Sequence, residues 1–188
     1  MDRNFALELV RVTEAAALGA AKGMGRGDEV AAESAGVLGM VKAFGSVAVK
    51  ARIVIGRGRT LEGESLEPGR TVGSGEGPRV DLAVDPLEGT NPCASGRYNA
   101  LACIAAAEEG GLLAVPEVYM EKIAVGPAAR GAVALDKTPT ENLRAVAQAL
   151  GRNVDQLTVA ILDRPRHKDL IEEVRAAGAR IRHMLDGD

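Results

Sequence analysis

The chain has 188 residues and a formal net charge of −3 at pH 7, which suits one or two domains with a sizeable buried core. It has no basic surplus and no block of Lys or Arg, which argues against a nucleic-acid binder that works by neutralising phosphates. The partner is therefore expected to be a small molecule. No hydrophobic run is long enough for a membrane span or follows a basic signal-peptide start, and two cysteines make no disulfide framework. We therefore expect a cytoplasmic protein.

The core has to be built from small aliphatic side chains. Hydrophobic residues make up 46% of the chain but aromatic residues only 2%, so Ala, Val, Leu and Ile have to pack closely. Cys93 and Cys103 have no Cys-x-x-Cys spacing and no nearby His, and we interpret them as core residues rather than zinc ligands.

The first two predicted elements are helices. Apolar residues recur at helical spacing over residues 5–22, and the glycine-rich segment 23–27 ends this helix. Asp28 is well placed to cap a second helix that runs toward Phe44. The Arg26-Gly27-Asp28 triplet is therefore interpreted as a helix start rather than a cell-adhesion motif.

A strand rich in β-branched residues is expected over residues 47–55, followed by Gly56-Arg57-Gly58-Arg59. A Gly-x-Gly after a strand is weak evidence for phosphate binding, and no third glycine or helical pattern follows that would indicate a dinucleotide site. A nucleotide-binding α/β module that uses the loops at Gly56 and Gly73 stays open as an alternative. Residues 60–78 form a glycine- and glutamate-rich connection.

The next apolar run delivers a carboxylate to a strand end. Asp85 is expected to be the last strand residue, because Pro86 has no N–H for a ladder. Glu88 follows after a short bend, and Gly89 permits the positive φ that folds Thr90 back toward Asp85. Such clustered hard oxygens suit Mg²⁺ or Mn²⁺ and phosphoryl transfer to water. The alternative is an Asp-Pro turn with a solvated Glu.

The second half of the chain predicts strands and helices in alternation. Residues 99–107 and 120–125 are expected to be buried strands. Thr138-Pro139-Thr140-Glu141 combines a cap, a proline at the first helical position and a glutamate three residues after the cap, which predicts a helix start.

A βαβ unit with parallel strands is expected from strand 158–162, helix 168–177 and strand 180–185. Ligands bind beyond the carboxyl ends of such strands, which here carry Asp163-Arg164-Pro165-Arg166-His167 and Asp186-Gly187-Asp188. The arginines could clamp a phosphate or sugar hydroxyls, and the aspartates could accept hydrogen bonds or help to bind metal. An ordinary charged surface loop is the alternative.

Seven segments stand in an order that indicates a known family: Arg11-Val12-Thr13-Glu14-Ala15-Ala16, Gly25-Arg26-Gly27-Asp28, Val84-Asp85-Pro86-Leu87-Glu88-Gly89-Thr90, Tyr119-Met120-Glu121-Lys122, Val125-Gly126-Pro127, Arg164-Pro165-Arg166-His167 and Asp186-Gly187-Asp188. They resemble the class II fructose-1,6-bisphosphatases, which belong to the lithium-sensitive, metal-dependent sugar and inositol phosphatases. The resemblance implies a layered α-β-α-β sandwich. It also implies removal of the 1-phosphate of fructose 1,6-bisphosphate with Mn²⁺ or Mg²⁺ in gluconeogenesis, by a homo-oligomer.

The resemblance also implies roles for individual residues. Asp85 and Glu88 would be metal ligands, and Thr90 would orient or activate the attacking water. Glu33 stands where the family usually has a metal-binding Asp, and its longer side chain could still reach. The implied substrate-binding residues are Gly89, Tyr119, Arg164, Pro165, Arg166, Asp186, Gly187 and Asp188.

Three departures from the family pattern concern charge. Arg57 stands where the family's Gly-Glu-Gly-Glu loop offers a metal carboxylate, and Arg59 replaces its neighbour. Glu29 stands where the family has a Lys. A positive charge beside a divalent ion is strongly unfavourable, so Arg57 has to swing away or a metal is lost.

Two domains are expected: an N-terminal α+β domain with the metal site over residues 1–135, and the incomplete start of a second α/β domain over residues 136–188. Family members continue beyond Asp188, so the fold is expected to be truncated at its C-terminus. The alternative function is a catalytically impaired or inactive relative that serves as a sugar-phosphate-binding or partner subunit.

Overall fold

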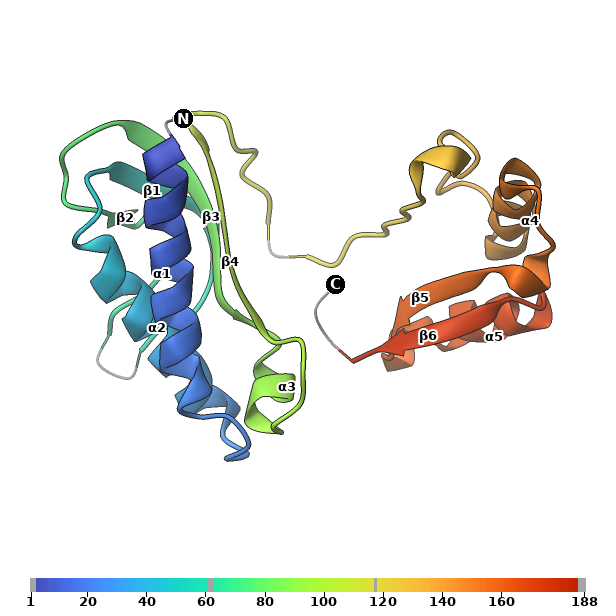
Figure 1. Ribbon diagram of the computed structural model, residues 1–188, viewed down its shortest axis with the longest axis horizontal. Coiled ribbons are helices and arrows are strands. Elements are labelled where there is room, and N and C mark those ends of the chain that lie inside the picture. Colours follow the sequence, from blue (N-terminus) through green and yellow to red (C-terminus); the bar gives the residue numbers. More distant parts are fainter. Residues whose placement is uncertain (1–2, 61–62, 117, 186–188) are drawn as a thin grey trace. The chain divides into compact units, whose positions relative to one another are not determined.

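The computed structural model describes residues 3–60, 63–116 and 118–185 (Figure 1). The chain divides into two compact units, Met1–Pro116 and Glu117–Asp186. This division lies nearer to the N-terminus than the predicted boundary between residues 135 and 136. Among the described residues, no helix has the length and apolar character needed to cross a bilayer.

The first unit begins with two antiparallel helices, α1 (Arg3–Ala21) and α2 (Glu29–Phe44). The predicted cap is confirmed, because Asp28 Oδ1 accepts a hydrogen bond of 2.9 Å from the Ala31 N–H. Small residues let the two helices approach closely, since a Cβ added at Gly19 would collide with a main-chain carbonyl of α2. The two predicted helices are therefore confirmed and form a tightly packed pair.

A four-stranded mixed sheet has the order β2-β1-β3-β4. Its strands are β1 (Lys50–Gly56), β2 (Thr71–Val72), β3 (Arg79–Glu88) and β4 (Leu101–Glu108). β1 and β3 are parallel, and β3 and β4 are antiparallel. The short helix α3 (Thr90–Ala94) follows β3 directly.

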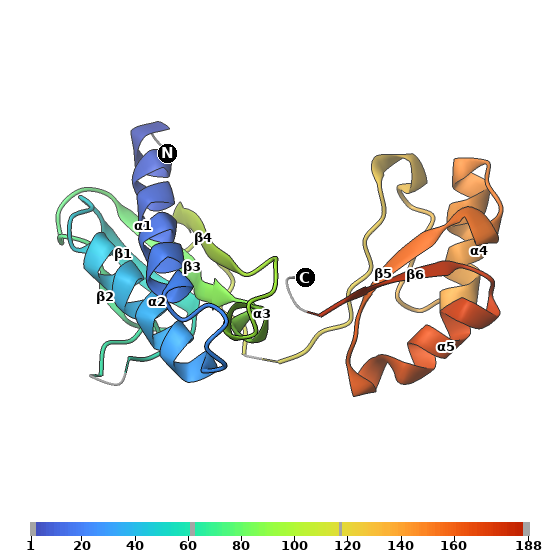
Figure 2. The same cartoon turned by 60° about the horizontal axis from the view of Figure 1, so that its bottom comes forward.

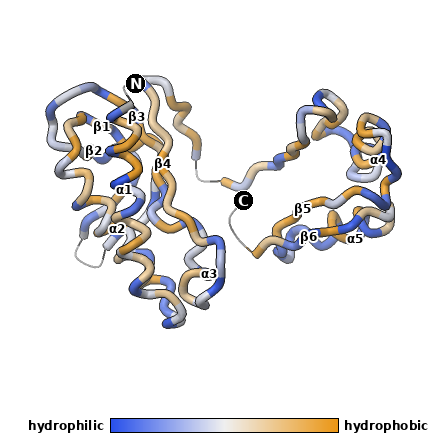
Figure 3. Tube along the Cα trace, in the orientation of Figure 1, coloured by the Kyte–Doolittle hydropathy of each residue, from blue (hydrophilic) through white to orange (hydrophobic). Residues whose placement is uncertain are grey.

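One face of this sheet packs under α1 and α2 to form the core of the first unit (Figures 1 and 2). The hydropathy trace shows the matching hydrophobic stretches along β1, β3 and β4 (Figure 3). Alternate strand residues face the helices, as the two-residue period of a strand requires. The core residues are Val12, Ala16, Val37, Met40, Phe44, Val47, Val49, Ala51, Ile53, Leu66, Val80, Leu82 and Val84.

The second unit is built around the parallel pair β5 (Thr158–Leu162) and β6 (Arg180–Met184), joined through α5 (Lys168–Ala176). This confirms the predicted βαβ unit. The helix α4 (Pro139–Leu150) packs with them around a small aliphatic core. The described residues of this unit also form the short 3₁₀ helices η1 (Pro127–Ala129), η2 (Val154–Gln156) and η3 (Pro165–His167).

The predicted strand over residues 120–125 is wrong, because this segment forms no strand in the described part of the chain. Its side chains are exposed, so the apolar run does not reflect a buried strand. Further along the second unit, the buried Asn142 amide accepts a hydrogen bond from Ala134 N (3.0 Å) and donates one to Ala134 O (2.9 Å), which ties the chain before α4 to that helix. This contact explains why residues before 136 belong to the second unit.

The mixed sheet and the helices confirm the α/β class. The predicted end of β3 at Asp85 is wrong, since the strand continues through Pro86 to Glu88. A register shift on β3 between Asp85 and Glu88 absorbs the proline, and a β-bulge is one of the places where a strand tolerates a residue without an N–H.

Asp81 is the most buried charged residue of the first unit, and the sequence reasoning missed it. Its side chain is fully buried and accepts hydrogen bonds from Arg52 at 3.1 Å and from Gly110 N at 2.8 Å. We expect Asp81→Ala to lower the free energy of unfolding by about 1–2 kcal/mol, because it removes the acceptor shared by Arg52 and Gly110 N and leaves a space where a fully buried side chain stood. Urea unfolding of the full chain measures this loss.

The matched control is Glu109→Ala, which removes an exposed carboxylate that lies 3.6 Å from Arg79. We expect that variant to cost less than about 1 kcal/mol. Equal losses in the two variants would contradict the role given to Asp81.

The helix α4 begins with the capping box that the sequence indicates. The Glu141 carboxylate of this box should make the stability of the chain depend on pH. The hydrogen bonds that Glu141 accepts from the Thr138 backbone and hydroxyl hold the pKa of Glu141 below its usual value of 4.5. A lowered folded pKa adds stability at neutral pH that is lost as the pH falls below 4.5 through the folded pKa.

Glu141→Gln keeps the hydrogen-bonding shape of the box but removes the charge. We therefore expect the stability of the wild-type chain to fall more steeply than that of Glu141→Gln below pH 4.5, as followed by urea unfolding at several pH values. Parallel pH profiles would show that this carboxylate does not contribute.

Candidate active site around Asp85

The β-bulge at Pro86 brings two carboxylates to the same face of the sheet. Asp85 lies opposite Cys103 on β4, and Glu88 lies opposite Leu101. Residues three apart on a regular strand point to opposite faces, whereas Leu101 and Cys103 are two apart and share a face. The extra residue on β3 therefore places Asp85 and Glu88 together on the face turned away from α1 and α2.

Cys103 is close to both carboxylates. The pKa of its thiol is raised by partial burial and by the negative charges of Asp85 and Glu88. The side chain itself is exposed, so the prediction that Cys103 is a core residue is wrong, whereas Cys93 is buried as predicted. The two acidic side chains thus act on one small region of this sheet face.

Asp85 is engaged on both of its oxygens. Oδ1 accepts a hydrogen bond of 3.1 Å from Leu87 N, which fixes the side chain against the bulge. Oδ2 lies 3.3 Å from Nε of Arg57, which follows directly after β1. The residue that departs most from the family pattern therefore lies directly against the central predicted metal ligand.

Glu33 and Thr90 flank this site. Glu33, on α2, lies close to the main chain that follows Arg57, since a Cβ added at Gly58 would stand 3.4 Å from Glu33 Oε1. Gly89 has φ of 89°, which confirms the predicted positive φ, and it precedes Thr90, the first residue of α3. Glu29, the second charge departure, accepts a hydrogen bond of 2.9 Å from Asn91 Nδ2.

The donor chemistry of this region suits a hard divalent ion. Asp85, Glu88 and Glu33 offer carboxylate oxygens, which are the ligands that Mg²⁺ and Mn²⁺ prefer. In the part of the chain that the structure describes, no three Asp, Glu, His or Cys side chains already stand close enough to enclose an ion. The donor types therefore fit a divalent metal ion. In the structure, the positive charge beside the Asp85 carboxylate comes from the Arg57 guanidinium.

The predicted substrate residues of the second unit form a separate group. The Arg166 guanidinium lies over the ring of Tyr119, with Cζ 4.1 Å from the ring centroid, in a cation–π contact. Arg164 donates to the carbonyl of Asp163 at 3.1 Å, and Pro165 begins η3. The structure thus brings Tyr119 and Arg166 together at the end of β5. The predicted residues Asp186, Gly187 and Asp188 lie outside the described residues.

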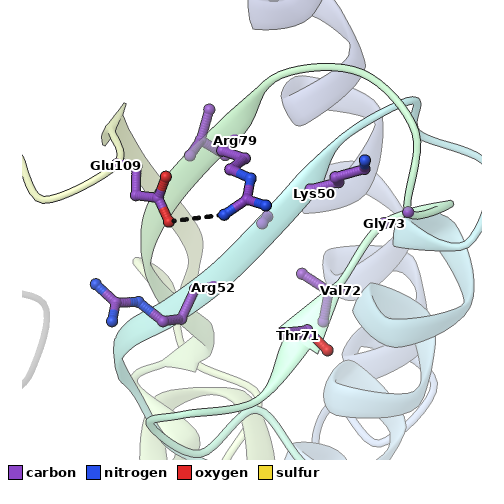
Figure 4. A pocket seen from close by; sticks show the side chains of 10 residues that line it. Lys50, Arg52, Thr71, Val72, Gly73, Arg79 and Glu109 are labelled. Carbon is purple, nitrogen blue, oxygen red and sulfur yellow. Dashed lines mark ion pairs between the residues drawn. The ribbon is translucent and has the colours of Figure 1, made fainter.

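A pocket of about 400 Å³ lies elsewhere on the first unit (Figure 4). Lys50, Arg52 and Arg79 line it, and Figure 4 shows Arg79 directed toward Glu109. β1 and β3 are parallel, so this pocket lies at their starting ends, whereas Asp85 lies near the end of β3. None of the predicted site residues lines it.

Residues 3–188 match the model of a family described as bacterial fructose-1,6-bisphosphatase, glpX-encoded. The chain belongs to this bacterial fructose-1,6-bisphosphatase family. The family indicated by the seven segments is thereby confirmed.

Three relatives of the chain carry the name D-fructose 1,6-bisphosphatase class 2/sedoheptulose 1,7-bisphosphatase. The protein of Parasynechococcus marenigrum (strain WH8102) is 47% identical to the chain, that of Synechococcus sp. (strain RCC307) 46%, and that of Prochlorococcus marinus (strain NATL1A) 45%. Each similarity extends over 188 residues, which is 100% of the chain and 56% of the relative. The chain therefore spans little more than half the length of these bisphosphatases.

The reactivity of Cys103 tests whether Asp85 and Glu88 converge. Because the thiolate is the nucleophile, carboxylates that raise the thiol pKa slow its alkylation at pH 7.5. We expect Asp85→Asn and Glu88→Gln each to speed the alkylation of Cys103 by iodoacetamide about threefold in the presence of EDTA.

Cys103→Ser supplies the background rate that comes from the buried Cys93. If neither carboxylate variant changes the rate above that background, the two acidic side chains do not share this face.

Proposed function

We propose that this chain carries the carboxylate part of a metal-dependent sugar-bisphosphate phosphatase site, which hydrolyses fructose 1,6-bisphosphate to fructose 6-phosphate and phosphate. The observation that carries the proposal is the β-bulge that sets Asp85 and Glu88 on one sheet face beside Cys103. Family membership and the bisphosphatase names of the relatives support the substrate class. A role in gluconeogenesis and action as a homo-oligomer are parts of the same proposal.

In this proposal, Asp85 and Glu88 hold Mg²⁺ or Mn²⁺, with Glu33 approaching from α2. When bound, such an ion neutralises phosphoryl oxygens and lowers the pKa of a water. The chain's own residues do the positioning. The Leu87 N–H holds the carboxylate of Asp85 in place, and Thr90, at the start of α3, orients the attacking water through its hydroxyl.

The sugar phosphate is proposed to contact the residues of the second unit. A guanidinium suits phosphate because its planar fork forms paired hydrogen bonds, and the stacking on Tyr119 holds the Arg166 head in a defined orientation. Arg164, Pro165 and Gly89 belong to the same proposed substrate-binding set. So do Asp186, Gly187 and Asp188.

A second candidate function is a catalytically weakened relative that binds sugar phosphate or a partner subunit. The ion pair between Arg57 and Asp85 favours it, because the guanidinium stands at an oxygen that a metal would use. The two candidates differ in one measurable quantity, which is the rate of metal-dependent phosphate release by the purified chain.

Phosphate release from fructose 1,6-bisphosphate with and without Mn²⁺ tests the proposal. We expect release that depends on Mn²⁺ and that Asp85→Asn or Thr90→Ala lowers by about 100-fold or more, because a ligand or the water-orienting group is lost. Glu76→Gln removes an exposed carboxylate from the loop before β3 and should leave the rate unchanged.

Release that stays at background in millimolar Mn²⁺ would favour the weakened relative. In that case, thermal stabilisation of the chain by fructose 1,6-bisphosphate would still measure sugar-phosphate binding, since a ligand at about 100 times its Kd adds roughly 2.7 kcal/mol.

A further inference from the structure

We propose that Arg57 is a built-in counter-ion of Asp85 that competes with the divalent cation, so that a metal binds this carboxylate only when the guanidinium is displaced. This inference rests on the metal-site part of the proposed function and adds the residue that sets the metal affinity. Its basis is the distance of 3.3 Å between Arg57 Nε and Asp85 Oδ2.

The register of the sheet directs Arg57 to this position. At the start of the parallel pair β1–β3, Ile53 lies opposite Leu82, and the same register would later place Gly56 opposite Asp85. A register shift after Ile53 adds one residue to β1, so that Gly56 lies opposite Val84 instead. Arg57 follows Gly56 directly after β1, and Asp85 follows Val84 on β3, so the shift brings the arginine close to the aspartate, with Nε 3.3 Å from Oδ2.

The main chain after Arg57 is also held in place. Gly58 has φ of 98°, a conformation that other residues rarely adopt. A Cβ at Gly58 would collide with Val37 of α2 and contact Pro86, so the backbone here lies directly against the helix and the β-bulge. The backbone next to Arg57 is therefore packed against its neighbours, and this packing holds the guanidinium near Asp85.

Charge makes the pair and the metal mutually exclusive at Asp85. A guanidinium keeps its charge at all ordinary pH values and cannot act as a metal ligand. An ion at Oδ2 would stand beside a like charge, and the repulsion is weakly screened because only 22% of the Asp85 side chain is exposed. The Leu87 N–H holds Oδ1, so Oδ2 is the oxygen for which the two cations compete.

A Mn²⁺ titration of the full chain, with free Mn²⁺ measured by electron paramagnetic resonance, tests the inference without substrate. We expect Arg57→Gln to bind Mn²⁺ about tenfold more tightly than the wild-type chain, because the competing charge is gone while the side chain stays polar. Arg57→Glu, which adds a carboxylate, should bind at least as tightly as Arg57→Gln.

The matched control is Arg59→Gln, which removes the same charge two residues further along. Arg59 pairs with Glu67 at 2.6 Å rather than with Asp85. We expect this variant to bind Mn²⁺ within about twofold of the wild-type chain, because the Arg59 side chain is 62% exposed and its charge is paired with Glu67 and screened by solvent. If both glutamine variants tighten binding equally, net charge explains the effect and the inference is overturned.

A double variant places the effect at Asp85. Adding Asp85→Asn to Arg57→Gln should return Mn²⁺ affinity to the wild-type level or below. Retained tight binding in the double variant would overturn the inference, as would an unchanged affinity in Arg57→Gln. Far-UV circular dichroism confirms that each variant is folded, and 45% of the Arg57 side chain is exposed, so substitution should leave the fold intact.

The titration and the phosphate-release assay can fail independently. If Arg57→Gln binds Mn²⁺ more tightly but no variant releases phosphate, the result supports competition between Arg57 and the metal and contradicts the proposed hydrolysis. If the wild-type chain releases phosphate in a Mn²⁺-dependent way but Arg57→Gln gains no Mn²⁺ affinity, the result supports the proposed hydrolysis and contradicts the competition between Arg57 and the metal.

Discussion

The candidate site depends on one extra residue in β3. A strand alternates its side chains between two faces, so acidic residues three apart would otherwise serve opposite sides of the sheet. The β-bulge at Pro86 breaks that alternation and puts Asp85 and Glu88 on the face that α1 and α2 leave uncovered. The proline is part of this solution, because a bulge leaves a backbone position without a ladder partner and proline lacks the N–H that would need one. The same β-bulge therefore accommodates Pro86 in the strand and brings the two carboxylates to one face.

A second register shift, in β1, controls the charge that meets this acidic pair. It brings Arg57 rather than Gly56 alongside Asp85, and the packed turn at Gly58 holds that arrangement. Two local irregularities in neighbouring parallel strands thus decide both which carboxylates gather and which cation stands beside them. The site is a balance between acidic donors and one internal guanidinium, and the binding of a divalent ion is the quantity that this balance controls.

The uncovered sheet face also shows how charge is accommodated away from the site. Asp81 is buried there, and it is tolerated because Arg52 and the Gly110 N–H provide donors for its oxygens. At the starting ends of the strands Arg79 lies 3.6 Å from Glu109, and near the end of β3 Arg57 lies 3.3 Å from Asp85. The same parallel pair therefore has a structural ion pair at one end and the candidate chemistry at the other.

The sequence alone determined the family and most of the helices and strands. Helix caps such as Asp28 and Thr138 act within a few residues, so their signals are complete in the sequence, and the βαβ unit follows from hydrophobic periodicity. The seven ordered segments sufficed for family membership. The apolar run at 120–125 was misassigned because a short run does not reveal whether a partner strand is present. Only tertiary structure decided strand register, because register depends on pairing between segments far apart in the chain. That pairing carried β3 through Pro86, placed Glu88 with Asp85, and set Arg57 against the carboxylate that the sequence had assigned to a metal.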